Sequence, residues 1–220
     1  MIDEKIKNFA QTLTHSEREI LKTIFSFSYT ESHDKGSKET EDCLKILQKL
    51  QSRKDVDADG IAFVGDAGIS SSLFDAINSE SQTLARDCMR FEDHLVSTAG
   101  EIGKSFGKSE YLKNLVSAHV GKSYPTGKVN YLYYDSEGMG IKPHIDNDEF
   151  PINVIMMLEH ESYSNSKSSL RFHLTDQSYK DVYLKPGELI IFFADTVVHE
   201  RTPLSSGEIV RIAAFGYNLM

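Results

Sequence analysis

The sequence predicts an α+β protein in which a helical N-terminal half packs on a C-terminal half made of β-strands. In the first half, apolar residues recur at helical spacing over long stretches. From Tyr124 onward, short runs rich in β-branched and aromatic residues alternate with Gly, Pro, Ser and Asp turns, which is typical of a compact β-sandwich or barrel. Hydrophobic residues make up 40% and charged residues 26% of the 220 residues, and these proportions exclude collagen-like, disordered and disulfide-scaffold proteins.

The predicted helices occupy most of the N-terminal half. Apolar stripes indicate two short helices before residue 32, a helix over 39–54 that follows a loop at 32–38, and two or three helices over 71–120. Between them, the turn DVDADG precedes a short strand at 61–64.

The predicted strands fill the C-terminal half. We therefore divide the chain into a mainly helical region over 1–123 and a β-rich core over 124–220, and expect the two to form one integrated domain. The strand-like runs are VNYLYYD, INVIMMLEH, SLRFHL, KDVYL, ELIIFFAD and IVRIAAFGY.

Charge and cysteine content limit the partners and the compartment. The chain carries 24 basic and 33 acidic residues, a net charge of −9, so binding to nucleic acid or to an anionic membrane is disfavoured and small or cationic partners are favoured. Cys43 and Cys88 lie outside any metal-binding motif and predict free thiols. With no leader-like start and no apolar run of ~20 residues, we expect a soluble cytoplasmic protein; the sequence does not indicate an oligomeric state.

One set of polar residues in the β half suits metal chemistry. His144 and Asp146 are two residues apart on a predicted strand end, so both side chains point to the same face. His199 comes 53 residues after Asp146, far enough for short strands to return to the same end of a barrel. Two imidazoles and one carboxylate on one side of a metal suit Fe(II) and leave positions open. The same spacing in His15 and Glu17 lacks this meaning, because residues two apart diverge on a helix.

The order of these features resembles the Fe(II)/2-oxoglutarate-dependent dioxygenases. From Val129 to Tyr217 the chain has a strand, a Gly-containing turn, His-x-Asp, several strands, a Pro-Gly-Glu turn, a distal His and a basic residue on the final strand. The resemblance implies a double-stranded β-helix of the jelly-roll or cupin type, in which His144, Asp146 and His199 hold Fe(II). It also implies 2-oxoglutarate as cosubstrate, O2 as oxidant, and hydroxylation of a small molecule, for example a free amino acid. The carboxylate of Asp146 favours hydroxylation over halogenation.

The resemblance also implies a basic residue that pairs with the far carboxylate of 2-oxoglutarate. Arg suits this task because its planar fork binds a carboxylate through two hydrogen bonds. We expect Arg211 on the final strand, because Arg201 is only two residues from His199 and would lie at the mouth. Family members place this residue about ten positions after the distal His, which is Ile209 here, and an offset of two preserves the strand face.

A tyrosine on the strand VNYLYYD is expected to give a second contact with 2-oxoglutarate. Tyr131 and Tyr133 share one face of the strand and Tyr134 takes the other, and the sequence does not decide which face looks inward. Asn153 is a polar residue in an apolar strand and needs a partner if buried. We expect it to contact the cosubstrate.

Substrate contacts are expected from several polar residues. Residues 147–149, with Asp148 at their centre, form an acidic segment after His-x-Asp that would attract an ammonium or guanidinium group. Arg171 and His173 share one face of an amphipathic strand and reach the substrate only if that face looks inward. Tyr134 and, at the mouth, Arg201 are the remaining candidates for substrate contacts.

Four other functions remain open from the sequence. Two belong to the same superfamily, an oxidative demethylase of nucleic acid and a protein or peptide oxygenase, and the net charge argues against the first. The third is a cupin-like binding module that does not turn over substrate. The fourth is a zinc hydrolase, but the sequence offers no carboxylate beside the triad that could be an obvious general base.

Overall fold

The computed structural model describes residues 59–163, 167–174 and 178–220, together with isolated positions before residue 59. The helices predicted before residue 32 and over 39–54, the loop at 32–38 and Cys43 lie outside the described residues, apart from a few single helical positions.

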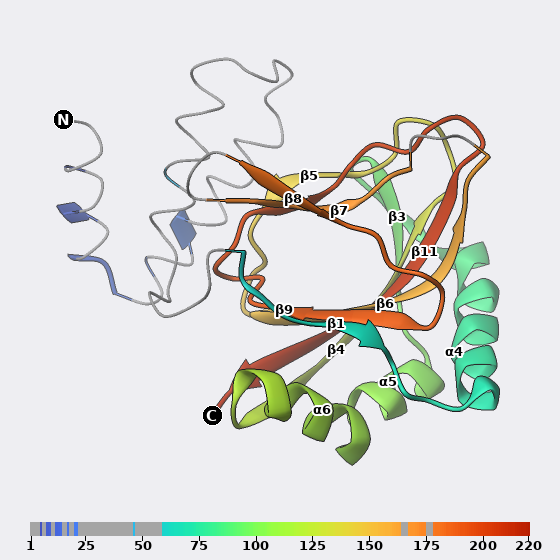
Figure 1. Cartoon of the computed structure of the whole chain (residues 1–220), viewed down its shortest axis with the longest axis horizontal. Helices are drawn as coiled ribbons and strands as arrows, with labels where there is room; N and C mark the ends of the chain where they lie inside the picture. The colour runs from blue at the N-terminus through green and yellow to red at the C-terminus, as the bar shows by residue number, and fades with distance from the viewer. Residues whose placement is uncertain are drawn as a thin grey trace.

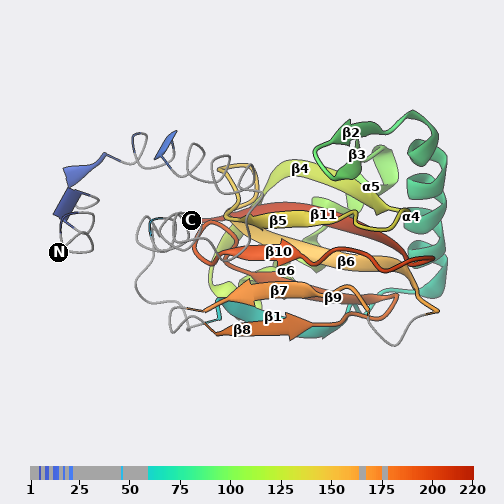
Figure 2. The same ribbon diagram turned by 90° about the horizontal axis from the view of Figure 1, so that it is seen from above.

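Two antiparallel sheets face each other and form the core of the molecule, with the smaller sheet above the larger one in Figure 1. Figure 2 looks down on the smaller sheet. The larger sheet contains, in spatial order, β1 (Ile61–Asp66), β9 (Glu188–Phe192), β6 (Ile152–Glu161), β11 (Ile209–Leu219), β4 (Ser123–Tyr134), β3 (His94–Thr98) and β2 (Met89–Phe91). The smaller sheet contains β5 (Ile141–His144), β10 (His199–Arg201), β7 (Leu170–His173) and β8 (Tyr179–Val182).

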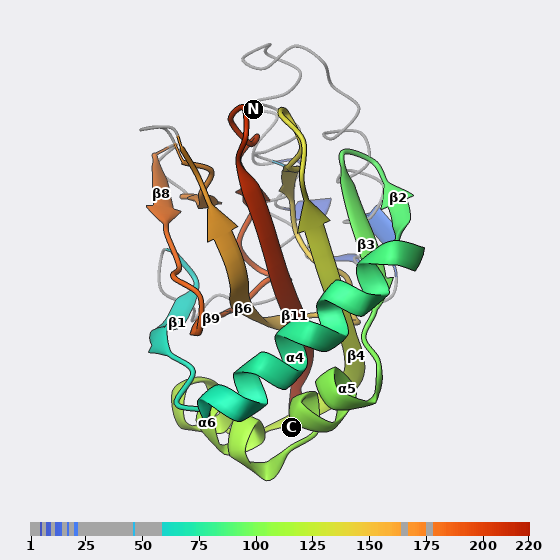
Figure 3. The same cartoon turned by 90° about the vertical axis from the view of Figure 1, so that its right-hand side faces the viewer.

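Three α-helices cover the outer face of the larger sheet, as Figure 3 shows: α4 (Ser71–Leu84), α5 (Glu101–Gly107) and α6 (Glu110–Val120). A short 3-10 turn, η1 (Ala85–Asp87), follows α4. The hydroxyl groups of Ser70 and Ser109 accept hydrogen bonds from the third residue beyond them and so cap α4 and α6, which is the usual way of satisfying free N–H groups at a helix start. The prediction of two or three helices over 71–120 is confirmed.

The prediction of helix was wrong over one part of that region. The region 71–120, for which helices were predicted, includes Met89, Phe91 and Leu95, but these residues lie on β2 and β3, a hairpin at the edge of the larger sheet. Leu95 pairs with Tyr133 of β4. Helical spacing of a few apolar residues is a weak signal, and a distant pairing partner overrides it. The strand predicted at 61–64 is confirmed as β1, which pairs with β9.

Side chains along β4 and β11 point alternately to the two faces of the larger sheet and so contribute to two separate hydrophobic cores. One face of the larger sheet packs on the helices and the other faces the smaller sheet. The helix side takes Val129, Tyr131 and Tyr133 from β4 and Ala213, Phe215 and Tyr217 from β11. The inner side takes Leu132 and Tyr134 from β4 and Val210, Ile212 and Ala214 from β11.

Glu80 of α4 joins the helices to the larger sheet. Its carboxylate accepts hydrogen bonds from the backbone N–H groups of Ile102 (2.8 Å) and Gly103 (2.9 Å), and from the hydroxyl of Tyr131 (2.7 Å). Two free N–H groups at the start of α5 are thereby satisfied. Burial raises the pKa of Glu80, but the hydrogen bonds from Gly103, Tyr131 and Ile102 outweigh it and hold the pKa below its ordinary value of 4.5.

We expect Glu80→Gln to lower the free energy of unfolding by about 1–2 kcal/mol at pH 7, because charge-assisted hydrogen bonds are lost from a half-buried site. The folded pKa lies below the unfolded one, so this stabilisation is present above about pH 4.5 and is lost as the pH falls through the folded pKa. Urea unfolding at pH 7 and pH 3.5 measures both effects. Glu110→Gln, which changes an exposed glutamate on α6, is the matched control, and an equal loss in both variants would contradict the prediction.

Candidate metal centre

Three side chains that are distant in sequence meet at one end of the smaller sheet. His144 ends β5 and His199 begins β10, and the two are directly paired across the strands. Asp146 Oδ1 lies 3.2 Å from His144 Nε2 and 3.7 Å from His199 Nε2. One ligand atom from each residue lies within 4.8 Å of the other two. The convergence expected from the sequence is therefore present.

Both imidazoles are held in the tautomer that suits a metal ligand. His144 Nδ1 lies 2.8 Å from the carbonyl oxygen of Lys142, and His199 Nδ1 lies 3.0 Å from that of Val197. A carbonyl oxygen only accepts, so each Nδ1 carries the proton and donates it. Each Nε2 then keeps its lone pair on the side of Asp146, as metal ligation requires.

Asn153 of β6 fixes the carboxylate of Asp146. Its amide nitrogen donates a hydrogen bond of 2.8 Å to Asp146 Oδ2, which leaves Oδ1 toward the two histidines. Asn153 is buried and its amide oxygen lacks a hydrogen-bond partner within the described residues. Asn153 thus contacts the triad directly, and the sequence argument that it needs a buried partner is met by Asp146.

The environment of the triad favours a neutral His199 beside an ionised Asp146. Burial lowers the pKa of His199 to about 4, and the charge of His144 adds to this effect. Burial raises the pKa of Asp146, but His199, His144 and Asn153 outweigh it and hold the pKa below its ordinary value. Burial lowers the pKa of His144, but the nearby carboxylate of Asp146 and the carbonyl oxygen of Lys142 outweigh burial and the net shift is upward.

A cavity of about 450 Å³ lies between the sheets next to the triad, a volume within the ordinary range for small-molecule sites. Tyr134 of β4 and Arg201 of β10 line it. Tyr134 Oη and Arg201 Nε are buried and lack a hydrogen-bond partner in the described part of the chain. Unpaired buried donors are costly, so two of them in one cavity indicate a site for an anionic ligand.

The structure does not bring Arg211 into this cavity. Its guanidinium lies 2.6 Å from the carboxylate of Glu159 and donates to the side-chain oxygen of Asn78 on α4 at 3.0 Å. Ile212 and Ala214 are the β11 residues that line the cavity, so Arg211 is on the helix side. The argument that an offset of two preserves the face assumed that Ile209 faces inward, whereas Ile209 is partly exposed.

The tyrosines are also divided between the two faces. Tyr131 and Tyr133 point to the helices, where Tyr133 Oη donates to the carbonyl oxygen of Ser81 at 2.9 Å and lies 2.8 Å from Ser97 Oγ. These two residues therefore do not reach the cavity, and the expectation that they contact 2-oxoglutarate is corrected. Tyr134 is the tyrosine of this strand that faces inward.

The remaining substrate candidates lie away from the cavity. Arg171 pairs with Asp181 at 2.7 Å and stacks over the ring of Tyr179 at 4.0 Å. His173, on the same strand face, lies 3.1 Å from Glu200. Asp148 is exposed and is not part of the cavity wall, whereas its neighbours at 147 and 149 are.

The β2–β3 hairpin contributes residues that the sequence analysis missed. Phe91, Glu92 and His94 line the cavity, because the hairpin extends the larger sheet beyond β4. The sequence offers little signal for this hairpin, because Glu92-Asp93 is not one of the Gly- or Asn-containing pairs that are typical of a two-residue hairpin turn. Burial lowers the pKa of His94 to about 4, helped by the charge of His144.

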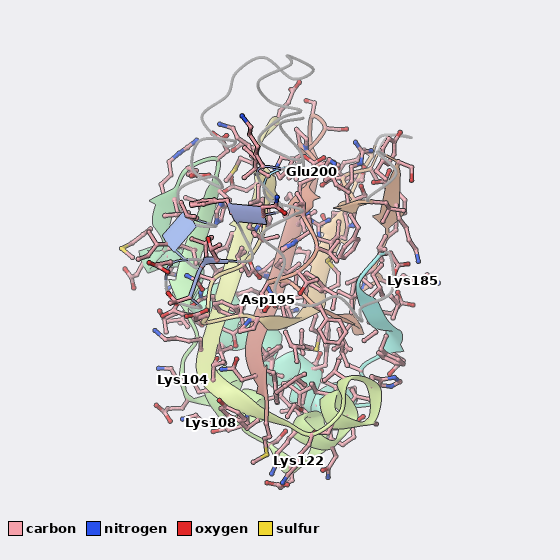
Figure 4. All side chains as sticks on the ribbon, turned by 90° about the vertical axis from the view of Figure 1, so that its left-hand side faces the viewer. Lys104, Lys108, Lys122, Lys185, Asp195 and Glu200 are labelled. Atoms are coloured by element: carbon pink, nitrogen blue, oxygen red, sulfur yellow. The ribbon has the colours of Figure 1, made fainter. Side chains whose placement is uncertain are left out.

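None of the described lysines belongs to the cavity wall, although Lys128 pairs with the wall residue Glu149. In Figure 4 the labelled Lys104, Lys108 and Lys122 lie near the helices, away from Asp195 and Glu200. Within the described residues, the cavity wall contains one arginine and no lysine. No helix among the described residues has the length and apolar character needed to cross a membrane; placement in the cytoplasm stays a prediction.

The comparisons with known proteins identify the fold. No protein-family model and no curated protein match the sequence, whereas many solved structures match the fold. The epimerase SnoN from nogalamycin biosynthesis, described as non-heme and alpha-ketoglutarate-dependent, has a TM-score of 0.63 at 13% identity over 74% of this chain and 78% of its own. HygX from Streptomyces hygroscopicus, solved with nickel and 2-oxoglutarate, has a TM-score of 0.57 at 14% identity over 74% of this chain and 84% of its own.

A prolyl-4-hydroxylase from Pseudomonas putida is a third such structure, with a TM-score of 0.51 at 15% identity over 72% of this chain and 92% of its own. These likenesses confirm the predicted double-stranded β-helix. The fold is that of solved 2-oxoglutarate-dependent non-heme oxygenases, and the His-x-Asp and distal His residues lie together within it.

Proposed function

We propose that the protein is an Fe(II)- and 2-oxoglutarate-dependent dioxygenase that hydroxylates a small molecule with O2. The observation that carries the proposal is the meeting of His144, Asp146 and His199 with both Nε2 atoms turned toward Asp146 Oδ1. Two imidazoles and one carboxylate are the donor set that suits non-heme Fe(II). The fold supports the same class.

The three triad residues would hold the iron, and Asn153 would keep Asp146 in place. Iron bound there supplies the oxidising chemistry, in which O2 and 2-oxoglutarate are consumed and succinate, CO2 and a hydroxylated product are formed. The chain's own task is to fix the ligand atoms. The hydrogen bonds from His144 and His199 to backbone carbonyl oxygens set the tautomers, and the hydrogen bond from Asn153 sets the carboxylate.

Arg201 and Tyr134 would bind the far carboxylate of 2-oxoglutarate. Both side chains are buried in the cavity wall with an unpaired donor atom. Arg201 is two residues after His199 on β10 and so shares its strand face. A carboxylate at this place would satisfy both donors, and burial would strengthen the interaction. Arg201 therefore replaces Arg211 in the proposed site.

The small-molecule substrate is supported by the size of the cavity and by two of the structural neighbours. SnoN has been solved with nogalamycin RO, and HygX with hygromycin B. In the described part of the chain, the cavity wall has one arginine and no lysine, which argues against nucleic acid as substrate. A protein or peptide substrate and a cupin-like binding module are the alternatives that the test below separates.

We also propose that residues 1–123 and 124–220 form one integrated domain. The support comes from the described residues, since β1 pairs with β9 and β3 pairs with β4, so strands from the first region complete a sheet of the second.

The test is release of succinate from 2-oxoglutarate by the purified protein. We expect release that requires both Fe(II) and O2, that increases when the true substrate is added, and that His144→Ala abolishes. A mass-spectrometric screen of amino acids and other metabolites should then find a product heavier by ~16 Da, the mass of one oxygen atom. A binding module or a zinc hydrolase would release no succinate under any of these conditions.

A further inference from the structure

The β2–β3 hairpin forms one wall of the cavity mouth. Phe91 is 52% exposed and Glu92 is exposed, whereas His94 is only 5% exposed. All three line the cavity, so the hairpin runs from the rim toward the interior. Glu92 occupies the turn with a φ of 50°, a backbone conformation that L-residues rarely adopt.

Among the acidic residues of the described cavity wall, Glu92 is the one without a partner. Asp146 belongs to the triad, and Glu149 lies 2.5 Å from Lys128. Among the described residues, the Glu92 carboxylate has neither a hydrogen bond nor an ion pair. An unpaired carboxylate at the mouth of a largely apolar cavity attracts a cation.

His94 provides an independent sign of a ligand beside Glu92. Its Nδ1 is buried and lacks a hydrogen-bond partner within the described residues. Its ring lies edge-on to Phe91 at 5.6 Å and is stacked near Tyr134 at 5.8 Å. The rings of Phe91, His94 and Tyr134 therefore form a row from the rim to the tyrosine proposed to contact 2-oxoglutarate. His94 Nδ1, a polar atom without a partner, lies within this row.

We propose that the substrate is a small molecule with an ammonium or guanidinium group, and that Glu92 is the residue that selects it. The carbons next to the cation would pack on Phe91 and His94, and His94 Nδ1 would meet a polar group of the substrate. The cation would then lie at the rim, with the remaining part of the substrate directed toward the triad. The proposal deepens the proposed function and rests on it.

The experiment compares amino acids that share the α-ammonium and α-carboxylate groups and differ in the charge of the side chain, which is the cation assigned to Glu92. The pairs are L-arginine with L-citrulline and L-lysine with N6-acetyl-L-lysine, and each is titrated into the full chain loaded with Ni(II) and 2-oxoglutarate, with binding followed by NMR. We expect the cationic member of at least one pair to bind about 5- to 10-fold more tightly, because one partly exposed charge-assisted contact is added. Glu92→Gln should remove this preference, and Glu92→Lys should reverse it toward L-glutamate.

Glu137→Gln is the matched control, because it removes the same charge from an exposed loop outside the cavity wall, and the preference for cations should persist in it. Equal binding within both pairs, including no binding of either member, overturns the proposal, as does a preference that Glu92→Gln leaves intact. Binding of Ni(II) and 2-oxoglutarate is measured first in the same samples. Its absence would refute the proposed function, whereas its presence without a preference for cations would refute the substrate class alone.

Discussion

Replacing His199 by alanine is expected to weaken Fe(II) binding by more than about 100-fold and to abolish 2-oxoglutarate turnover. Loss of a partner that only orients a metal ligand typically costs about 10- to 100-fold in affinity, so loss of a ligand itself should cost more. The two remaining ligands, His144 and Asp146, are too few for a stable site. Metal affinity is measured by calorimetry with Ni(II), and turnover by succinate release.

His199 also packs between aromatic rings, so the fold needs its own control. Its ring centroid lies 4.8 Å from that of Phe192 and 6.2 Å from that of Phe172, and an alanine would leave a void there. His199→Phe keeps a ring in the cluster while it removes the ligand, and it should lose metal binding equally. His119→Ala changes an exposed histidine on α6 and should retain both metal binding and turnover. Tight Ni(II) binding by His199→Phe would contradict the assignment of the triad.

The triad could be predicted from the sequence because two of its three residues, His144 and Asp146, are close together in the chain. The rule that residues two apart on a strand share a face predicted that His144 and Asp146 point together; β5 ends at His144, but Asp146 directly beyond it still lies 3.2 Å from the His144 imidazole. His199 then needed only a return to the same sheet, which β10 makes by pairing with β5. The tautomer-setting contacts were not predictable, because they depend on backbone carbonyl oxygens whose positions follow from the turn geometry.

The carboxylate anchor was not predictable, because it depends on which face of a long strand looks inward. In β11 that choice is made by packing, with Ile212 and Ala214 toward the cavity and Arg211 toward Glu159. A register shift between Arg211 and Ile212 in the pairing with β6 changes the local geometry further. No counting of residues from His199 reveals such a shift.

The hairpin at 89–98 was not predicted, for a related reason. Its strands are three and five residues long, too short for a clear alternation. The longer one, β3, pairs with β4, which is distant in sequence. Glu92 and His94 therefore escaped notice as cavity residues. In contrast, the strands of the C-terminal half are rich in β-branched and aromatic residues, and the predicted runs are all observed as strands.

Arg201→Met is expected to weaken 2-oxoglutarate binding by about 100-fold or more. Truncating one partner of a buried, hydrogen-bonded charge pair costs about 2–5 kcal/mol, and about 2.7 kcal/mol corresponds to 100-fold in Kd. Because methionine keeps an unbranched apolar stem and carries no charge, the metal site should persist. Binding of 2-oxoglutarate to the Ni(II)-loaded protein is measured by calorimetry, and the Michaelis constant for 2-oxoglutarate by succinate release.

Arg211→Met is the matched control, and it separates the two arginines by opposite signatures. Arg211 holds Glu159 and Asn78 on the helix side, so its loss should lower the free energy of unfolding by about 1–2 kcal/mol and leave 2-oxoglutarate binding intact. Arg201 is buried and, unlike Arg211, pairs with no carboxylate among the described residues, so without 2-oxoglutarate its replacement by an apolar side chain should be neutral or stabilising. Retained 2-oxoglutarate affinity in Arg201→Met, together with its loss in Arg211→Met, would show that β11 presents its other face to the cavity and would return the anchor to Arg211.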